Sequence, residues 1–335
     1  MLFKKYNQCV YCKSKTLKKE KNQSLKENFY TKAIKSDLKI SKSIWSQIKV
    51  YKCQECKTIQ NNPWFNEEAC RKIYSNIYGQ HNRSWSNLIN FLNKGILPNH
   101  GNLYKILKNK IKIKKYAEFN SPFMGLLLNF FKTEYKENNL FYKKIFKNII
   151  NYLTSRQVAG KSKYYQKVSS YKAIKYFNQC ENLKRKNLIK YNSDKYLFID
   201  NSSLCWGQND NYKSVNSKSF ASELLNLKIL DLNKNNENIK FDLFGIFHTL
   251  DHTFEPSKIL NFALNNSKYV IVYCHIDKKI EKQHLFSLNK EFIKFLNKKK
   301  IYTLDLTNKI NKKITSPELY FLCSKNKRLI SKIKL

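Results

Sequence analysis

Two Cys-x-x-Cys pairs near the start of the chain are the residues whose spacing points most directly to chemistry. Cys9 and Cys12 form the first pair, and Cys53 and Cys56 form the second. Each pair presents two thiolates to one ion through a tight turn, so two pairs complete the tetrahedral shell of a structural zinc site. Such a closed shell leaves no position for water, and its zinc would stabilise a small polar segment. We therefore predict a structural Zn²⁺ site with these four ligands.

Two other interpretations of the cysteine pairs stay open. The four thiols could be free, or one pair could be a redox motif of the thioredoxin type. The redox interpretation is the weaker of the two, because it needs a single motif on a turn between a strand and a helix.

Three histidines near the end of the chain are candidates for acid–base chemistry. His248 and His252 follow an apolar run at 241–247, and His284 follows a second run at 269–273. Ligands of open α/β sheets bind outside the carboxyl ends of the strands, and imidazole has a pKa suited to proton transfer. We assign His248, His252 and His284 as candidate catalytic residues, although a structural role is the stronger interpretation for His252. A metal site at His248, Asp251 and His252 is a weaker alternative, because the Glu that follows the first His of a zincin is absent.

The composition predicts a folded protein with a strongly basic surface. The chain has 335 residues, a formal net charge of +40, 42% hydrophobic residues and 14% aromatic residues. This length accommodates two modest domains. The charge suggests a nucleic-acid partner, but only five of the 64 basic residues are arginine and the lysines are scattered. Nucleic-acid readers use the planar arginine fork, so we favour a solvated lysine surface over a nucleic-acid footprint.

The start of the chain lacks the apolar run of a signal peptide, and no apolar stretch is long enough to cross a membrane. We therefore expect a cytoplasmic protein without a membrane partner. The nine cysteines would then be metal ligands or buried thiols, since disulfides are rare in a reducing compartment.

The pattern of apolar runs predicts two parts with a boundary near residue 95, where Gly95, Pro98 and Gly101 interrupt the chain. Residues 1–95 would hold the zinc site and a helical segment at 66–94. Residues 96–335 would form an α/β domain, because short apolar strands alternate with helices there. We cannot assign a role to the long insertion at about 126–195. The expected helices cover 103–113 and 256–265, and the expected strands cover 116–119, 196–200, 227–230, 241–247, 269–273 and an antiparallel pair at 301–306 and 318–323.

The run that begins with Phe241-Asp242 resembles the fourth strand and following loop of class I S-adenosylmethionine-dependent methyltransferases. It continues through an apolar strand to His248-Thr-Leu-Asp-His252 and then to Pro256, which opens a helix. The resemblance extends to a fifth strand at 269–273, a segment at 283–287 before a helix, and the terminal antiparallel pair. It covers about residues 103–325 and implies a Rossmann-like, mostly parallel sheet. The two-pair zinc domain is similar to the one that precedes this fold in sugar C-methyltransferases.

The resemblance also implies cofactor-binding residues for S-adenosylmethionine. Glu118 would end the first strand, and the loop after it, with Asn120 and Gly125, would lie against the methionine part of the cofactor. The resemblance puts Asp200 at the ribose hydroxyls and Asp231 at the adenine amino group, although a turn residue is an equally good interpretation of Asp200. The family's loop is rich in glycine, whereas the loop at 120–125 has one glycine and a proline.

The leading hypothesis is an S-adenosylmethionine-dependent methyltransferase that acts on a small-molecule acceptor. The resemblance of the zinc domain implies a nucleotide-linked sugar as that acceptor. Two other hypotheses stay open, because the loop at 120–125 differs from the family's glycine-rich loop and because the chain is strongly basic. One is a non-catalytic, zinc-containing RNA-binding protein with a degenerate methyltransferase fold, and the other is an RNA methyltransferase. The sequence does not define an oligomeric state.

Overall fold

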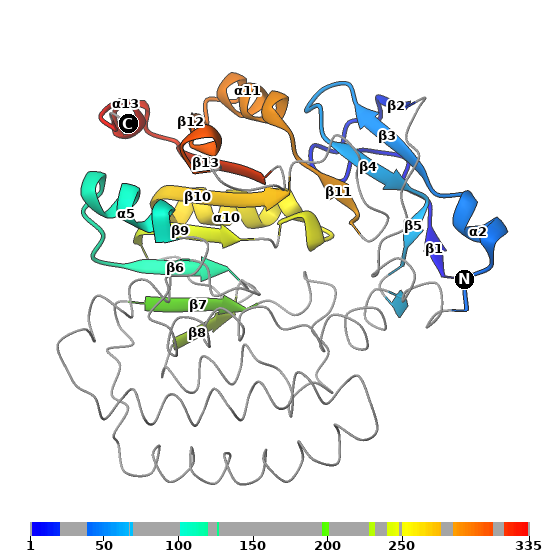
Figure 1. The fold of residues 1–335 in the computed structure, drawn as a ribbon, viewed down its shortest axis with the longest axis horizontal. Helices are drawn as coiled ribbons and strands as arrows, with labels where there is room; N and C mark the ends of the chain where they lie inside the picture. Colours follow the sequence, from blue (N-terminus) through cyan, green and yellow to red (C-terminus); the bar gives the residue numbers. More distant parts are fainter. Residues whose placement is uncertain are drawn as a thin grey trace, which may run out of the picture.

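A computed structural model of the chain shows a mixed α/β protein with two main sheets (Figure 1). At 196–200, 228–231, 252 and 275 it describes the backbone alone. The described residues are 2–20, 39–66, 68–69, 101–119, 126, 196–200, 228–231, 240–247, 250–275, 284–310 and 318–333.

The larger sheet has seven strands, and most of them are parallel. Their order across the sheet is β12-β13-β10-β9-β6-β7-β8. Strands β8, β7, β6, β9 and β10 run parallel to their neighbours, whereas β13 is antiparallel to both β10 and β12. The strands are β6 (Tyr116–Phe119), β7 (Tyr196–Asp200), β8 (Lys228–Asp231), β9 (Phe241–Phe247), β10 (Ser267–His275), β12 (Tyr302–Asp305) and β13 (Glu318–Ser324).

These strands confirm the ones predicted from the sequence, with shifts of one or two residues at their ends. The terminal antiparallel pair is also confirmed. A simple turn does not join it, however, because helix α12 (Thr307–Ile310) follows β12 directly. All seven residues of β9 are buried, as expected for a strand of a parallel sheet that is covered on both faces.

Helices flank this sheet and bury one apolar side each. Helix α10 (Pro256–Asn266) connects β9 to β10 and has proline in its first turn, where the missing N–H costs no hydrogen bond. Its Ile259, Leu260 and Ala263 are fully buried. The other helices around the sheet are α5 (Gly101–Lys110), α11 (Lys290–Lys298) and α13 (Lys327–Ser331).

Asp242 fixes the amino end of the sheet. Its Oδ2 accepts the backbone N–H groups of Lys114 and Lys115 at 2.8 and 3.0 Å, and its Oδ1 accepts from Lys268 Nζ at 2.7 Å. Burial raises the pKa of Asp242, but these hydrogen bonds outweigh it and the pKa is lowered. Asp242 therefore joins the starts of β6, β9 and β10 at the end of the sheet opposite the expected site.

The second sheet belongs mainly to an N-terminal unit, which we define as residues 2–20 and 39–66. Its four antiparallel strands have the order β11-β4-β3-β2. Strand β11 (Phe286–Ser287) comes from late in the chain and pairs with β4. The unit itself contains β1 (Phe3–Lys4), β2 (Leu17–Lys19), α2 (Lys42–Ser46), β3 (Lys49–Cys53), β4 (Ile59–Asn62) and β5 (Trp64–Phe65).

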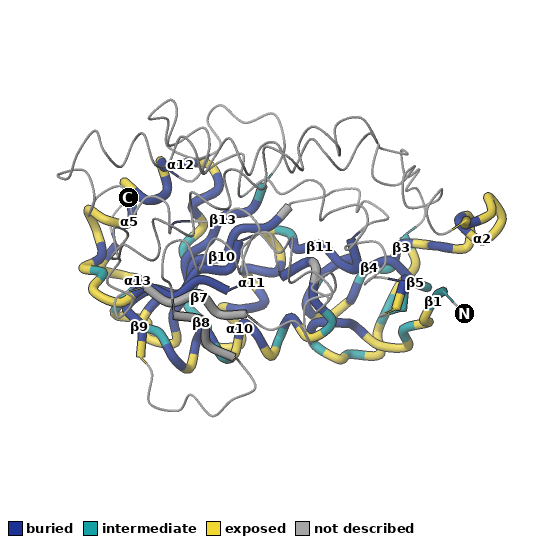
Figure 2. Tube along the Cα trace, turned by 90° about the horizontal axis from the view of Figure 1, so that it is seen from below, coloured by how far each residue is buried: buried dark blue, intermediate teal, exposed yellow. Residues whose placement is uncertain are grey.

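One cluster of buried residues extends from the N-terminal unit into the larger sheet. It contains Cys9, Tyr11 and Trp64 from the unit together with Phe244 and Phe321 from the sheet. The burial map in Figure 2 shows buried chain in both parts. The predicted boundary near residue 95, most of the helical segment at 66–94 and nearly all of the insertion at 126–195 lie outside the described residues.

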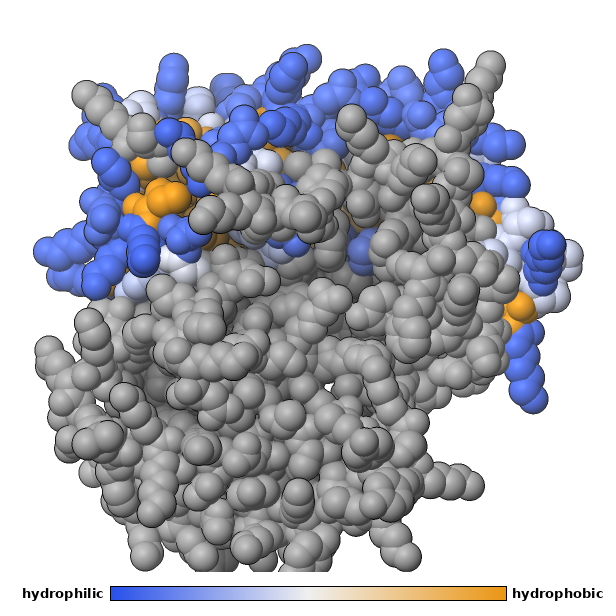
Figure 3. All heavy atoms as spheres, viewed as in Figure 1, coloured by the Kyte–Doolittle hydropathy of each residue, from blue (hydrophilic) through white to orange (hydrophobic). Residues whose placement is uncertain are grey.

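The surface of the described part is mostly hydrophilic in the view of Figure 3. Among the residues that the structure describes, no helix has both the length and the apolar character that a membrane crossing requires.

Candidate functional site

The four predicted zinc ligands come together in the N-terminal unit. The Sγ atoms of Cys9 and Cys56 are 3.5 Å apart, those of Cys12 and Cys53 are 3.6 Å apart, and all four lie within 4.8 Å of one another. A tetrahedron with zinc–sulfur bonds of about 2.3 Å has edges of about 3.8 Å. The four sulfurs therefore fit a single metal ion, and both the donor type and the spacing are compatible with zinc.

The two Cys-x-x-Cys turns have the same backbone geometry. Cys9 N–H donates to the Ser14 carbonyl at 2.7 Å, and Cys53 N–H donates to the Thr58 carbonyl at 2.9 Å. The residue after each second cysteine is a lysine with a positive φ, 61° at Lys13 and 64° at Lys57. This conformation turns the chain back over the pair, so that both thiols of a turn face the same point.

Three of the four thiols, Cys9, Cys12 and Cys56, shift one another's pKa values. Hydrogen bonds from the Cys12 and Cys56 thiols lower the pKa of Cys9 to about 2. The pKa of Cys12 is raised to about 12, because its hydrogen bond with Cys9 and its burial outweigh the lowering effect of Cys56. Hydrogen bonds to Cys12 and Cys9 also raise the pKa of Cys56. Ionisation of Cys9 thus opposes ionisation of Cys12 and Cys56, and a bound cation would offset this opposition.

We predict that glycine at position 57 stabilises the zinc-loaded protein. A residue with a side chain costs about 1–2 kcal/mol in the left-handed region, and replacement by glycine removes this cost. Part of the gain is lost, because glycine gives the unfolded chain more conformational freedom. Lys57→Gly should raise the free energy of unfolding by about 0.5–1 kcal/mol, measured by chemical denaturation. Lys49→Gly, at an exposed position of β3, is the control and should lower it. Equal losses in both variants would contradict the strain at Lys57.

The second cysteine turn and the strand before it are attached to helix α11 by a hydrogen bond and two ion pairs. Asn289 Nδ2 donates to the Lys57 carbonyl at 2.7 Å, while its Oδ1 accepts the Phe292 N–H at 3.1 Å and caps the helix. Two ion pairs join the same elements, Lys52 with Glu291 at 2.8 Å and Lys299 with Glu55 at 3.5 Å. The residue that caps α11 thus also contacts the second cysteine turn.

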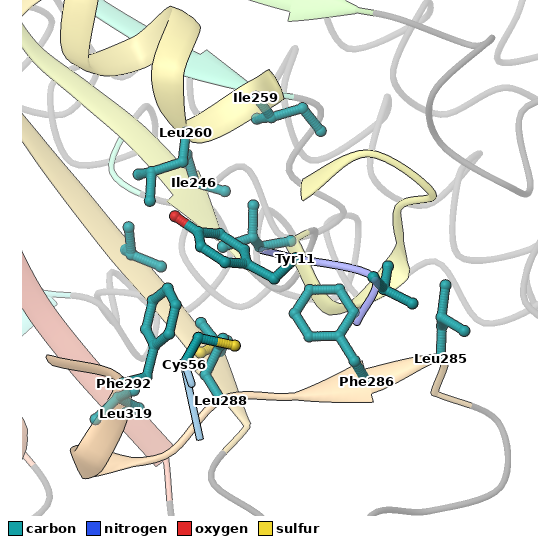
Figure 4. Packing of buried hydrophobic residues seen from close by; sticks show 14 of the residues in the cluster. Tyr11, Cys56, Ile246, Ile259, Leu260, Leu285, Phe286, Leu288, Phe292 and Leu319 are labelled. Carbon is teal, nitrogen blue, oxygen red and sulfur yellow. The ribbon is translucent and has the colours of Figure 1, made fainter. Parts of the chain in front are cut away.

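Tyr11, which lies between the first two cysteines, packs into the interior next to α11. Its ring meets Phe292 edge-on, with centroids 4.7 Å apart and an interplanar angle of 89°. Figure 4 shows Tyr11 among Ile246, Leu260 and Phe286, which come from β9, α10 and β11. The cysteine cluster and the larger sheet thus share the same core.

The segment around His284 lies at the junction of the two sheets. Asn61 Nδ2 donates to the His284 carbonyl at 2.7 Å, and Asn61 N–H donates to the Leu285 carbonyl at 2.9 Å. His284 is only 4% exposed. The N-terminal unit lies beyond the carboxyl ends of β6, β9 and β10 (Figure 1), so His284 is on the side of the sheet where the sequence predicts a site.

The carboxyl ends of the parallel strands bring three predicted cofactor residues to one edge. Glu118 lies one residue before the end of β6, and Asp200 and Asp231 end β7 and β8. Phe119 pairs with Ile199, and Asp200 pairs with Asp231. The three carboxylate-bearing positions are therefore on neighbouring strands. For β7 and β8 the structure describes the backbone alone.

Glu118 accepts hydrogen bonds from two residues, one before it and one after it in the chain. Its fully buried Oε2 accepts the Tyr116 hydroxyl at 2.6 Å and the Leu126 N–H at 3.0 Å. Burial and the nearby carboxylate raise the pKa of Tyr116, which keeps its hydroxyl protonated as a donor. The carboxylate thus holds the backbone of Leu126 next to the first parallel strand.

Gly245 makes room for this arrangement. It pairs with Glu118 across the sheet. A Cβ atom at position 245 would collide with the Tyr116 hydroxyl and would lie 2.6 Å from the Phe247 ring. Only glycine leaves room beside β9 for the Tyr116 hydroxyl that donates to the Glu118 carboxylate.

Several predicted site residues are not described. His248, Asn120 and Gly125 lie outside the described residues, and His252 is described by its backbone alone, in the short 3₁₀ helix η3 (Leu250–His252). Next to it, Asp251 is buried with 1% exposure, and the Thr253 hydroxyl donates to the Leu250 carbonyl at 3.0 Å. The catalytic roles of the three histidines stay predictions.

Sequence reasoning missed Tyr116, Gly245, Asn61 and Asn289. Only the Tyr116–Glu118 contact could have been predicted from the sequence. The two residues are two positions apart on one predicted strand, so their side chains lie on the same face. Comparison of the sequence with known protein families and with curated proteins finds no match.

Proposed function

We propose that this protein is an S-adenosylmethionine-dependent methyltransferase with a structural zinc site, and that its acceptor is a small molecule of the nucleotide-linked sugar type. The observation that carries the proposal is the strand order of the larger sheet. Counted along the chain from β6, the parallel strands have the order 3-2-1-4-5, which is the order of doubly wound nucleotide-binding sheets.

The last two strands add a more specific feature. The final strand, β13, is inserted antiparallel between β10 and β12. A terminal antiparallel pair on the fifth strand is also what the resemblance to class I methyltransferases implies. The run from Phe241 to Pro256, on which that resemblance depends, falls on the fourth strand of this sheet and the segment after it. Sequence motif and topology therefore support the same family.

The described residues on the carboxyl edge suit the cofactor. Doubly wound sheets bind nucleotides where the strand order reverses, which here is between β6 and β9. Glu118 lies beside that point and accepts the Leu126 N–H. Asp200 and Asp231 would accept hydrogen bonds from the ribose hydroxyls and the adenine amino group. S-adenosylmethionine, when bound, supplies an electrophilic methyl group on a sulfonium.

The protein's own task is to hold the acceptor in line with that methyl group and to accept its proton. His248 and His252 follow the strand next to the reversal point and are the candidates for the proton acceptor. The zinc-bearing unit beyond the strand ends would cover the acceptor and exclude water. The zinc itself has no open position and would only hold this cover in place.

Calorimetric titration of the zinc-loaded chain with S-adenosylmethionine and S-adenosylhomocysteine tests the proposal. We expect micromolar dissociation constants for both. Absence of heat at millimolar ligand would reject the methyltransferase function. Salt-dependent binding to a defined RNA, with preference over random RNA, would then support the RNA-binding alternative that the charge of +40 suggests.

A further inference from the structure

Two tyrosines and a glutamate form a second cluster at the carboxyl edge of the larger sheet. Tyr273 on β10 pairs with Tyr320 on β13, and two positions further outward along these strands His275 pairs with Glu318. Tyr273 also pairs with Phe247, the last residue of β9. Glu318 therefore lies two residues beyond the level of the carboxyl end of β9.

This cluster projects to the same face of the sheet as Glu118. Glu118 pairs with Gly245, and Gly245 pairs with Ile271. Side chains alternate between faces along a strand, so Tyr273, two residues after Ile271, shares the face of Glu118. Three strand spacings, about 14 Å, separate β6 from β13, the strand that carries Glu318. Glu118 and Glu318 therefore share one face of the sheet at its carboxyl end.

The contacts within the cluster hold the carboxylate in one position. The rings of Tyr273 and Tyr320 stack with centroids 4.2 Å apart and planes 11° apart. The Tyr320 hydroxyl donates to Glu318 Oε2 at 3.1 Å. Both tyrosines are at most 2% exposed, whereas Glu318 is partly exposed. Burial raises the pKa of both tyrosines, so their hydroxyls stay protonated.

We propose that the Glu318 carboxylate, held by Tyr320 and Tyr273, binds the acceptor by accepting a hydrogen bond from a hydroxyl group of its sugar. The proposal rests on the methyltransferase function proposed above and names the acceptor side of the same site. An ionised carboxylate only accepts hydrogen bonds and repels phosphate, so it selects the sugar end of a nucleotide-linked sugar. Tyr320 and Tyr273 are positioning residues, because they act through Glu318.

The test uses the full zinc-loaded chain with Glu318→Gln and Tyr320→Phe, and with Glu255→Gln as a control. The Glu255 side chain is 49% exposed at the start of α10, where it pairs with Lys258 at 3.8 Å. The probes are S-adenosylhomocysteine for cofactor binding and UDP-linked and dTDP-linked hexoses for acceptor binding and methyl transfer. Melting temperatures of the three variants report folding.

We expect Glu318→Gln to raise the KM for the methylated hexose by about tenfold or more, because a hydrogen bond to a charged group is lost. Tyr320→Phe should raise it by about threefold. The affinity for S-adenosylhomocysteine should stay within a factor of two in both variants, and the control should match the wild type.

An unchanged KM in Glu318→Gln would overturn the proposal. Equal losses of cofactor and acceptor affinity would do the same, because they would indicate a structural role. A wild-type protein that binds S-adenosylhomocysteine but neither binds nor methylates any of the hexoses would also overturn it, since a sugar acceptor is part of the claim. Failure of the wild type to bind S-adenosylhomocysteine would instead reject the methyltransferase function itself.

Discussion

Replacement of Cys53 by serine will release the metal and unfold the N-terminal unit. Structural zinc sites of four thiolates bind with apparent free energies of about 10–16 kcal/mol, which equals or exceeds the stability of a typical domain. Serine removes one ligand and leaves three thiols within the buried cluster. We expect the free energy of unfolding to fall by about 5 kcal/mol or more.

The loss of stability should extend beyond the N-terminal unit. The Lys57 carbonyl, one residue after the second cysteine pair, accepts the side chain of Asn289, and Tyr11 packs on Phe292 of α11. Loss of the metal should therefore also loosen the start of α11 and strand β11. Hydrogen exchange of residues 284–298 should accelerate in Cys53→Ser, although these residues are more than two hundred positions away in sequence.

Metal analysis and thermal unfolding of the purified proteins measure this effect. Cys323→Ala is the matched control, because Cys323 is fully buried in β13 and is not part of the four-sulfur cluster. It should retain one zinc per chain and lose only the small amount of stability that a cavity costs. A Cys53→Ser protein that retains full zinc and an unchanged melting temperature would refute the four-thiolate site.

Replacement of Glu118 by glutamine should weaken S-adenosylhomocysteine binding by about 10- to 100-fold. The carboxylate accepts two buried donors, the Tyr116 hydroxyl and the Leu126 N–H. Glutamine has nearly the same shape, but it loses the charge that strengthens both hydrogen bonds, a loss of about 1.5–3 kcal/mol. The loop at 120–125 would then lose its anchor, and the cofactor would lose a preformed surface.

Calorimetric titration of Glu118→Gln against the wild type measures this loss. Tyr116→Phe is the matched control, because it removes one of the two donors and keeps the charge and the ring. It should show a smaller loss of affinity. Unaltered affinity in a correctly folded Glu118→Gln protein would show that the loop does not depend on this carboxylate.

The larger sheet could be predicted well because its strands are short apolar runs separated by polar segments. Every expected strand was found within two residues of its predicted bounds, and α10 began at the proline that the sequence marked. The four cysteines could also be predicted, because the Cys-x-x-Cys spacing itself dictates the turn that gathers the thiols. Both patterns lie within short segments of the chain, so they can be interpreted without knowledge of the whole fold.

The contacts between the two sheets could not be predicted from local patterns of this kind. Strand β11 has only two residues, and it pairs with β4 through contacts between distant parts of the chain. The sequence around Asn289 predicts at most a helix cap. It does not indicate that the same side chain also donates to the Lys57 carbonyl. The need for Gly245 depends on its register opposite Glu118, which only the assembled sheet defines. Asp242, part of the motif behind the resemblance, fixes the amino end of the sheet and lies away from the candidate site.

Strand β11 is synthesised long after its partner β4, and this order affects how the chain folds on the ribosome. All four metal ligands emerge with the first 56 residues, so zinc could bind early. The partner of Asn61, however, is synthesised 223 residues later, which takes about 10–45 seconds at common translation rates. During that time the outer edge of β4 has unpaired backbone groups, which invite pairing with other nascent chains. Translation speed and protein concentration should therefore influence the yield of correctly folded protein.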